Sequence, residues 1–265
     1  MLTTVTTLAV EIDDVVGIRA NNPSPLTLSG TNSWIVGRDP AWLIDPGPLL
    51  PEHLSALAQE IERRGGLGGV ALTHDHHDHA EGAPALLAMF DGVPLAAARG
   101  AVDVTLLDGD RFGPLEAVAT PGHAPDHLAF IHGPVVFSGD AVLGEGSVFI
   151  APDPGALRGY LDGLERLKER APKVICPGHG PLVSDPIAKL DTYIEHRLER
   201  ERKLVEALAG GERGVEGLLD AAWADVPTFL RPAAAITLAA HLDKLTEEDR
   251  LPEGVERPVV PDWYV

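Results

Sequence analysis

The densest run of chemically reactive side chains lies at residues 73–79, Thr-His-Asp-His-His-Asp-His. It directly follows a short apolar stretch, residues 69–73, which we expect to form a strand. Buried imidazole and carboxylate groups cost free energy unless they are paired, so a run this dense has few purely structural uses. Imidazole together with carboxylate suits zinc, iron or manganese. The run therefore predicts a transition-metal site.

The spacing within this run indicates two metal ions. His74 and His76 are two residues apart and can point to the same side of an extended segment. Asp78 and His79 follow what we expect to be a turn, where they can face a second ion. One loop cannot complete both coordination shells, so further ligands must come from elsewhere in the chain.

Three later segments supply candidates for these missing ligands. His123, Asp140 and His179 each follow an apolar, strand-like stretch, in Thr-Pro-Gly-His, Ser-Gly-Asp and Cys-Pro-Gly-His. The glycine in each segment permits a tight turn. Active sites in α/β folds gather at the carboxyl ends of strands, so we expect these segments to meet the run at 74–79.

The ordered set resembles the metallo-β-lactamase superfamily, whose pattern His-x-His-x-Asp-His, then His, then Asp, then His is matched completely. The matching residues, in chain order, are His74, His76, Asp78, His79, His123, Asp140 and His179. The resemblance implies a four-layer αβ/βα sandwich over residues 1–188. It implies one metal on His74, His76 and His123, and a second on Asp78, His79 and His179. Asp140 would bridge the two.

The same resemblance implies a metal-dependent hydrolase, for which we expect two zinc ions, with iron or manganese as alternatives. Such ions lower the pKa of a shared water from about 15.7 to near neutrality, and the hydroxide formed attacks a carbonyl or phosphorus centre. Asp78 and Asp140 are expected to orient this hydroxide, and Asp140 to take up a proton. Asp45, in the sequence Ile-Asp-Pro-Gly, and His127 are expected to lie behind the ligands and fix their orientation.

The other histidines are expected to have different roles. His77 lies within the run at a position that the family pattern leaves variable. His53, His132 and His196 are expected on the surface or on a helix face. The position of His241 is open, because the C-terminal part of the chain could fold over the cleft and bring this side chain to the substrate. The segment 144–150 and Tyr160 are expected to line that cleft.

Composition limits the classes of partner. The 21 Lys and Arg against 40 Asp and Glu give a net charge of −19, which repels polyanions at long range. Proteins that bind nucleic acid through phosphate contacts usually carry the opposite sign. Cys176 is the only cysteine and is expected to be buried in the core. This cysteine usage, and the lack of a basic leader at residues 1–14, predict a cytoplasmic protein. We expect no membrane span, because no stretch approaches about 18 apolar residues.

Short apolar runs alternate with amphipathic stretches over the first two thirds of the chain, which predicts a layered α/β core. Strands are expected at 33–37, 42–45, 69–73, 93–97, 115–119, 127–131, 135–138 and 174–176. Helices are expected from 51 to 64, at 83–90 and from 157 to 170. The sequence pattern changes near residue 188 from short apolar runs to long, charged, helix-like stretches. We expect helices at 188–210, 215–223 and 232–245, followed by an extended tail at 259–265. The predicted domains are therefore a catalytic domain, 1–188, and a mainly helical module, 189–265.

The segments that begin at Arg231 and Ala239 resemble the winged-helix extension of one superfamily branch, which includes a single-strand-RNA endonuclease and polyketide acyl-carrier thioesterases. Residues 188–265 hold ten Lys and Arg against sixteen Asp and Glu, so we expect this module to shape the cleft or a subunit interface. We expect hydrolysis of a small or carrier-bound ester or thioester. Alternatives are a single-stranded-RNA phosphodiesterase, a mononuclear iron oxygenase and a non-catalytic metal-binding interaction protein. The substrate and the oligomeric state are open.

Overall fold

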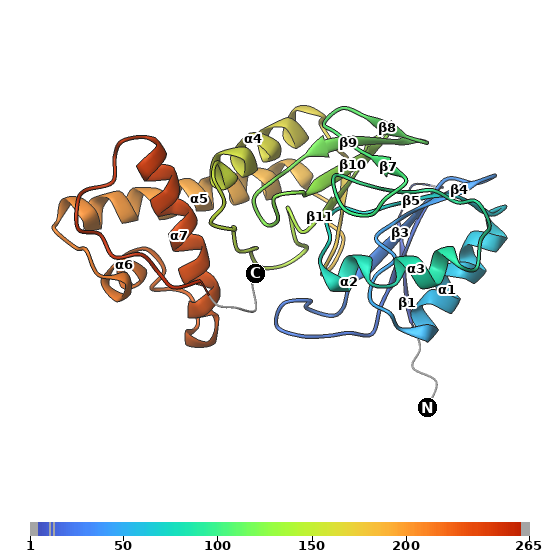
Figure 1. The fold of residues 1–265 in the computed structure, drawn as a ribbon, viewed down its shortest axis with the longest axis horizontal. Helices are drawn as coiled ribbons and strands as arrows, with labels where there is room; N and C mark the ends of the chain where they lie inside the picture. The colour runs from blue at the N-terminus through green and yellow to red at the C-terminus, as the bar shows by residue number, and fades with distance from the viewer. Residues whose placement is uncertain (1–4, 11, 13, 261–265) are drawn as a thin grey trace.

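The computed structural model describes residues 5–260 except 11 and 13, and it shows two packed β-sheets between layers of helices (Figure 1). The strands of the larger sheet run in the order β1-β2-β3-β4-β5-β6-β7, and those of the smaller in the order β12-β11-β10-β9-β8. Helices α1 and α3 cover the outer face of the larger sheet, and α4 and α5 cover that of the smaller. The four-layer αβ/βα fold expected from the sequence is confirmed.

The bounds of the strands are as follows. The larger sheet comprises β1 (Thr6–Ala9), β2 (Val15–Arg19), β3 (Asn32–Val36), β4 (Ala41–Ile44), β5 (Leu67–Ala71), β6 (Leu95–Ala97) and β7 (Val104–Thr105). The smaller sheet comprises β8 (Arg111–Phe112), β9 (Leu115–Ala119), β10 (Leu128–His132), β11 (Val135–Gly139) and β12 (Val174–Pro177). The helices are α1 (Pro51–Arg63), α2 (His77–Ala80), α3 (Ala83–Leu87), α4 (Ala156–Glu169), α5 (Pro186–Ala209), α6 (Val215–Ala222), η1 (Thr228–Leu230) and α7 (Arg231–Glu247).

The central strands are apolar on both faces because each sheet is covered on both sides. On β3, Trp34 and Val36 point between the sheets, whereas Ile35 points to the cluster beneath α1. On β11, Phe137 points between the sheets and Val136 to the cluster beneath α4. Successive side chains of a strand point to opposite faces, so one apolar run fills two layers of core.

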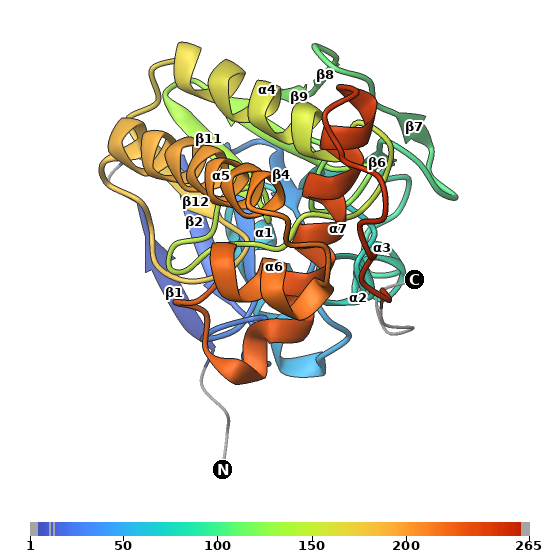
Figure 2. The same ribbon diagram turned by 90° about the vertical axis from the view of Figure 1, so that its left-hand side faces the viewer.

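The C-terminal helices form a second packed unit beside the sheets (Figure 1), and this unit faces the viewer in Figure 2. Asp185 caps α5 by accepting a hydrogen bond from the Ala188 amide, and Pro186 occupies the first turn, as is common at helix starts. The first half of α5 buries Leu190 in the core beneath α4, and its second half buries Leu204 in a core shared with α6 and α7. The domain division near residue 188 stays a prediction, and α5 runs continuously across it.

The winged-helix likeness also stays a prediction, because residues 186–260 as described contain helices and no strand. The extended tail expected at 259–265 lies mostly outside the described residues. None of the helices in the described part of the chain is both long enough and apolar enough to cross a bilayer.

Candidate functional site

The seven predicted ligands come together at one edge of the two sheets. β5 leads into His74 and His76, and the short helix α2 carries Asp78 and His79. The other three follow β9, β11 and β12, namely His123, Asp140 and His179. The turn expected before Asp78 is the single-turn helix α2. The sequence did not indicate a helix there, because four residues are too few to show helical periodicity.

Three histidine nitrogens face one another in the first group of candidate ligands. His76 Nδ1 lies 3.0 Å from His74 Nε2 and 3.1 Å from His123 Nε2. These atoms belong to a set that lies within 4.8 Å of one another, as ligands of one ion must. His74 and His123 are buried, and His76 is half-buried.

A second group lies beside the first. His179 Nε2 is 3.3 Å from His79 Nε2 and 3.2 Å from Asp78 Oδ2. Asp140 reaches both groups, since its carboxylate oxygens lie 3.5 Å from His79 Nε2 and 3.6 Å from His123 Nε2. The structure thus places Asp140 between the two clusters.

The rings of His79, His123 and His179 each direct Nδ1 at an oxygen outside the cluster, which leaves Nε2 facing the centre of the candidate metal site. His79 Nδ1 lies 2.8 Å from Asp45 Oδ2, and His123 and His179 direct Nδ1 at the carbonyl oxygens of Phe149 and Gly30, each at 3.4 Å. These groups accept hydrogen bonds, so a neutral ring keeps its proton on Nδ1 and its lone pair on Nε2. Lone pairs that face each other at 3.3 Å repel unless a cation lies between them. The donor set therefore fits divalent metal ions.

Asp45 supports both groups of candidate ligands. Its carboxylate accepts hydrogen bonds from the Thr73 amide and the Thr73 hydroxyl, each at 2.7 Å, in addition to the one from His79. Because the Thr73 hydroxyl donates to Asp45, its oxygen can only accept from His74 Nδ1, 2.9 Å away. Thr73 was missed in the sequence, and its position directly before the histidines is the signal that could have found it.

His127 holds the backbone of Asp140. Its Nε2 accepts from the Asp140 amide at 3.0 Å, and its Nδ1 lies 2.8 Å from Thr120 Oγ1. Burial, followed by the charge of His123, lowers the pKa of His127 to about 3, so the ring is neutral. Gly178 completes this side of the site, since a Cβ there would lie 2.5 Å from Asp140 Oδ1.

The site favours positive charge. Burial raises the pKa of Asp140, but His179 and His79 outweigh this effect and hold the pKa well below its usual value. Burial lowers the pKa of His179, but the Asp140 carboxylate outweighs this effect and raises the pKa of this imidazole to about 9. Without metal, protons on His79 and His179 balance the carboxylates, and bound divalent ions would replace them.

A cleft of about 1130 Å³ opens over the cluster and extends to the C-terminal helices. Its walls include the loop at 24–28, the loop at 145–149, and residues of α5 and α7. The expectation that segment 144–150 lines the cleft holds for residues 145–149. The expectation for Tyr160 is wrong, because this side chain is fully buried beneath α4 and donates to the Ala141 carbonyl oxygen.

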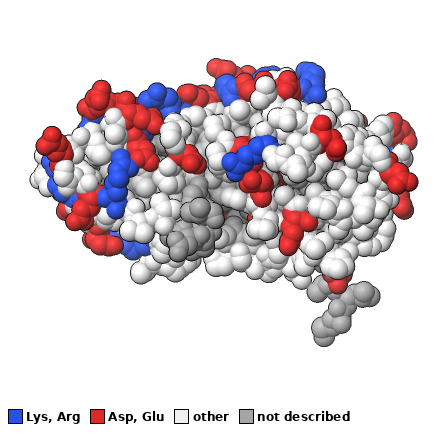
Figure 3. Space-filling view, viewed as in Figure 1, with Lys and Arg blue, Asp and Glu red and all other residues white. Residues whose placement is uncertain are grey.

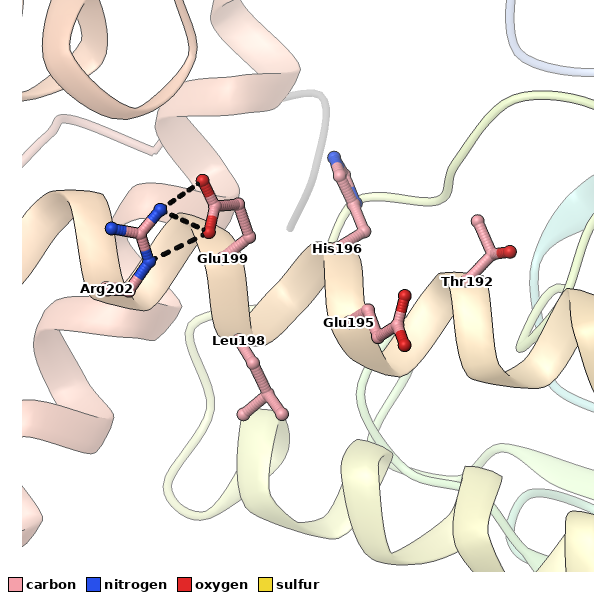
Figure 4. A pocket seen from close by; sticks show the side chains of 6 residues that line it. All are labelled: Thr192, Glu195, His196, Leu198, Glu199 and Arg202. Carbon is pink, nitrogen blue, oxygen red and sulfur yellow. Dashed lines mark hydrogen bonds and ion pairs between the residues drawn. The ribbon is translucent and has the colours of Figure 1, made fainter.

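A smaller hollow of about 610 Å³ lies on the outer face of α5 (Figure 4). Its lining side chains fan out around the helix, with His196 and Leu198 on opposite sides, and Glu199 pairs with Arg202. No set of polar groups converges there, so this hollow lacks the features of an active site.

The remaining histidines take varied places. His53 is buried and lies 2.9 Å from Ser33 Oγ, so the expected surface position is wrong; the residue lies on the face of α1 that packs against the sheet. His77 is exposed at the cleft, and His132 and His196 are half-buried. His241 is buried against Trp223, at 5.6 Å between ring centroids, and is not part of the cleft wall. Cys176 is buried, as expected.

Comparison with known proteins agrees with this geometry. Residues 101–179, which include His123, Asp140 and His179, match the model of the family described as the metallo-beta-lactamase superfamily. The chain is 31% identical to the beta-lactamase-like protein 2 homolog of Drosophila melanogaster, over 95% of this chain and 93% of that protein. It is 35% identical to an atrochrysone carboxyl ACP thioesterase of Aspergillus chevalieri, over 73% of this chain and 65% of that protein.

Among solved structures, a beta-lactamase domain protein from Burkholderia ambifaria superposes with a TM-score of 0.76 and 21% identity. The superposition covers 93% of this chain and 91% of that one, so the likeness in fold includes the C-terminal helices. The identity and coverage of the Drosophila relative establish the family. The chain belongs to the metallo-beta-lactamase superfamily and is a metal-dependent hydrolase.

Proposed function

We propose that this chain is a dinuclear zinc hydrolase that cleaves the thioester bond of a carrier-bound acyl group. The observation that carries the proposal is the convergence of histidine nitrogens and two carboxylates in two adjoining groups, with Asp140 reaching both. The thioester specificity is supported by the relative named as an acyl-carrier-protein thioesterase.

The proposed ligands divide as the distances do. His74, His76 and His123 would hold one ion, and Asp78, His79 and His179 the other, with Asp140 between them. Imidazole and carboxylate ligands suit zinc, and also iron or manganese. Two divalent ions bound there would make a water molecule acidic enough to lose a proton near neutral pH.

The protein's own groups would then direct hydrolysis. Asp140, whose carboxylate reaches both groups, would orient the attacking water and receive the proton that it loses. The water oxygen forms a new C–O bond to the acyl carbon, the C–S bond breaks, and the thiolate leaves with that proton. Thr31 Oγ1, 3.2 Å from Asp78 Oδ2, can donate to this carboxylate and hold it in place.

The cleft is large enough for an acyl group of substantial size. Its volume of about 1130 Å³ slightly exceeds the usual range for small-molecule sites, roughly 300–1,000 Å³. Leu26, Val226 and Leu230 supply apolar surface to its lining. This arrangement favours an acyl chain or ring system over a small ester.

The proposal is tested by metal analysis combined with thioester turnover. We expect about two zinc ions per chain and hydrolysis of acyl thioesters that stops on chelation. Replacement of Asp78 or Asp140 by Ala should abolish turnover, with the circular dichroism spectrum unchanged. Asp91→Ala, at an exposed carboxylate outside the candidate ligands and the cleft lining, serves as the control.

Three results would overturn parts of this proposal. About one iron per chain with oxygen consumption would replace the hydrolase with an oxygenase. Chelator-resistant turnover would remove the metal from the reaction. Full activity of Asp140→Ala would remove that residue from its role in proton transfer.

A further inference from the structure

Arg197 is a buried cation beside the cleft. It lies on α5, is only 2% exposed, and forms part of the cleft wall. Its Nη2 donates to Ser147 Oγ at 2.8 Å and to the Val148 carbonyl oxygen. Its Nε is buried without a hydrogen-bond partner, and no carboxylate of the described residues forms an ion pair with it. The positive charge of Arg197 is therefore not neutralised by the protein.

The neighbouring Arg200 shows the contrast. Both of its terminal nitrogens pair with Asp225, at 2.5 and 2.8 Å, which is the bidentate geometry typical of a neutralised arginine. The other ionisable groups around these arginines include the basic His196, His241 and Lys244. Tyr160 and Tyr193 also lie near Arg197, whose guanidinium is over the Tyr160 ring at 5.6 Å from its centroid, and their raised pKa values keep both phenols neutral, so neither supplies a counter-charge. Lys244 is itself paired with Glu201 and Glu248. Arg197 is thus the unpaired charge of this cluster.

The loop 147–149 connects the guanidinium to the proposed metal centre. Val148, whose carbonyl oxygen accepts from Arg197, precedes Phe149, whose ring lies 4.7 Å from the ring of His123. Ser147, Phe149 and Arg197 all line the cleft that contains the metal-binding cluster. A ligand held at the cluster can therefore extend past Phe149 toward Arg197.

We propose that Arg197 binds an anionic group of the substrate, a carboxylate or a phosphate, while the scissile bond lies at the metal centre. A buried guanidinium without a counter-charge is costly, and an oxyanion in the cleft would neutralise it through charge-assisted hydrogen bonds. Ser147, which is exposed in the cleft, adds a hydroxyl beside it. The inference rests on the proposed function and narrows its substrate class to acidic thioesters.

The competing explanation is that Arg197 only ties the loop 147–149 to α5. A structural tie would affect acidic and neutral substrates alike. A binding residue would change the preference between them. The test therefore compares two thioesters that differ only in charge: the mono-thioester of glutaric acid and the same compound with its free carboxyl group as a methyl ester.

The variant Arg197→Met removes the charge and keeps an unbranched apolar side chain. The matched control is Arg202→Met on the same helix, because Arg202 is exposed and pairs with Glu199 (Figure 4) and with Glu206. We expect wild type and Arg202→Met to prefer the acidic substrate by about tenfold or more in kcat/KM. Arg197→Met should lose this preference, mainly through a KM that rises more for the acidic substrate than for the neutral ester.

A binding measurement separates this inference from the proposed function. Trp223 lines the same cleft, so its fluorescence can report titration of the metal-loaded protein with glutarate or with inorganic phosphate. Saturable binding to wild type and Arg202→Met, weakened about tenfold or more in Arg197→Met, would support the anion site even if no thioester were hydrolysed. Glutarate binding would identify a carboxylate as the anion, and phosphate binding alone would identify a phosphate ester.

Two results would overturn the inference. One is an equal preference for the acidic substrate in wild type and Arg197→Met. The other is anion binding that is unchanged by Arg197→Met, which would place the anion on the metal ions or elsewhere. Active thioester hydrolysis together with either result would leave the proposed function standing and remove Arg197 from anion binding.

Discussion

Asp45 belongs to neither group of candidate metal ligands, yet its carboxylate orients a histidine in each of them. It bonds His79 directly and His74 through the Thr73 hydroxyl. Groups placed behind a ligand set the proton on the far nitrogen and the angle of the ring, and so control the affinity of the site. Two histidines in different groups depend on this one side chain.

Asp45→Asn should therefore weaken metal retention and lower kcat/KM, each by about 10–100-fold. The substitution keeps the shape and tolerates the positive φ of 51° at this position, but it removes the charge that His79 and Thr73 require. Metal content after dialysis against a weak chelator, measured with kcat/KM, checks this. Asp91→Asn is the control, and a fully loaded and active Asp45→Asn would show that Asp45 has no such role.

At the scale of elements, the sequence predicted the helices and strands that have strong hydrophobic periodicity or are bounded by glycine and proline. The strands before His74, His123, Asp140 and His179 and the long helix at 188–210 all have close counterparts in the structure. The edge strands β1, β7 and β8, and β2 beside β1, were not predicted. β7 and β8 have two residues each, and a strand of two residues shows no alternation that can be recognised in the sequence.

The candidate site was more predictable than the groups around it. The ligand residue types cluster in sequence beside glycines at strand ends, so their convergence could be anticipated. Thr73 and Arg197 could not be found in this way, because a single threonine or arginine is common and acquires meaning only from its neighbours in space. His53 was misplaced for the same reason: a polar residue on a helix is usually exposed, and only the packing of α1 shows its partner, Ser33.

Gly178, in the loop after β12, can be substituted to change the geometry of the site without changing any candidate ligand. Gly178 has no space for a side chain, since a Cβ would lie 2.5 Å from Asp140 Oδ1 and 2.8 Å from His79 Cε1. We expect Gly178→Ala to lower kcat at least about tenfold although every candidate ligand remains. Gly214→Ala is the control, because a Cβ there meets nothing closer than 3.5 Å. Unchanged kinetics in Gly178→Ala would mean that the site relaxes without cost.

Over the whole molecule, charge restricts the range of partners. The chain carries a net charge of −19, and on the face in Figure 3 acidic and basic side chains lie interspersed over the C-terminal helices. Interspersed charges of both signs offer no continuous basic track for a phosphate backbone. We therefore expect no saturable binding of labelled single-stranded RNA at about 0.15 M salt. Tight, salt-sensitive binding in a gel-shift assay would contradict this.

The stability of the whole fold should also depend on pH through His241. Burial, followed by the charges of Arg197 and Lys244, lowers the pKa of this imidazole to about 3, and neither ring nitrogen has a hydrogen-bond partner. In the unfolded chain the same group has a pKa of about 6.5. As the pH falls below about 6.5, the unfolded state therefore takes up a proton that the folded state does not, and stability is lost until the pH approaches about 3.

Between about pH 7.5 and pH 5 this linkage amounts to about 2 kcal/mol of unfolding free energy. His241→Leu removes the titration and leaves an apolar group of similar size, so its unfolding free energy should fall less over this range than that of wild type. Urea unfolding of the metal-loaded proteins at both pH values, followed by tryptophan fluorescence, measures the difference.

The histidines of the metal cluster titrate in both proteins and cancel in this comparison. His132→Gln, at a half-buried histidine at the end of β10, controls for loss of any histidine. An equal loss of stability in wild type and His241→Leu would show that the C-terminal core opens enough to protonate His241 without unfolding.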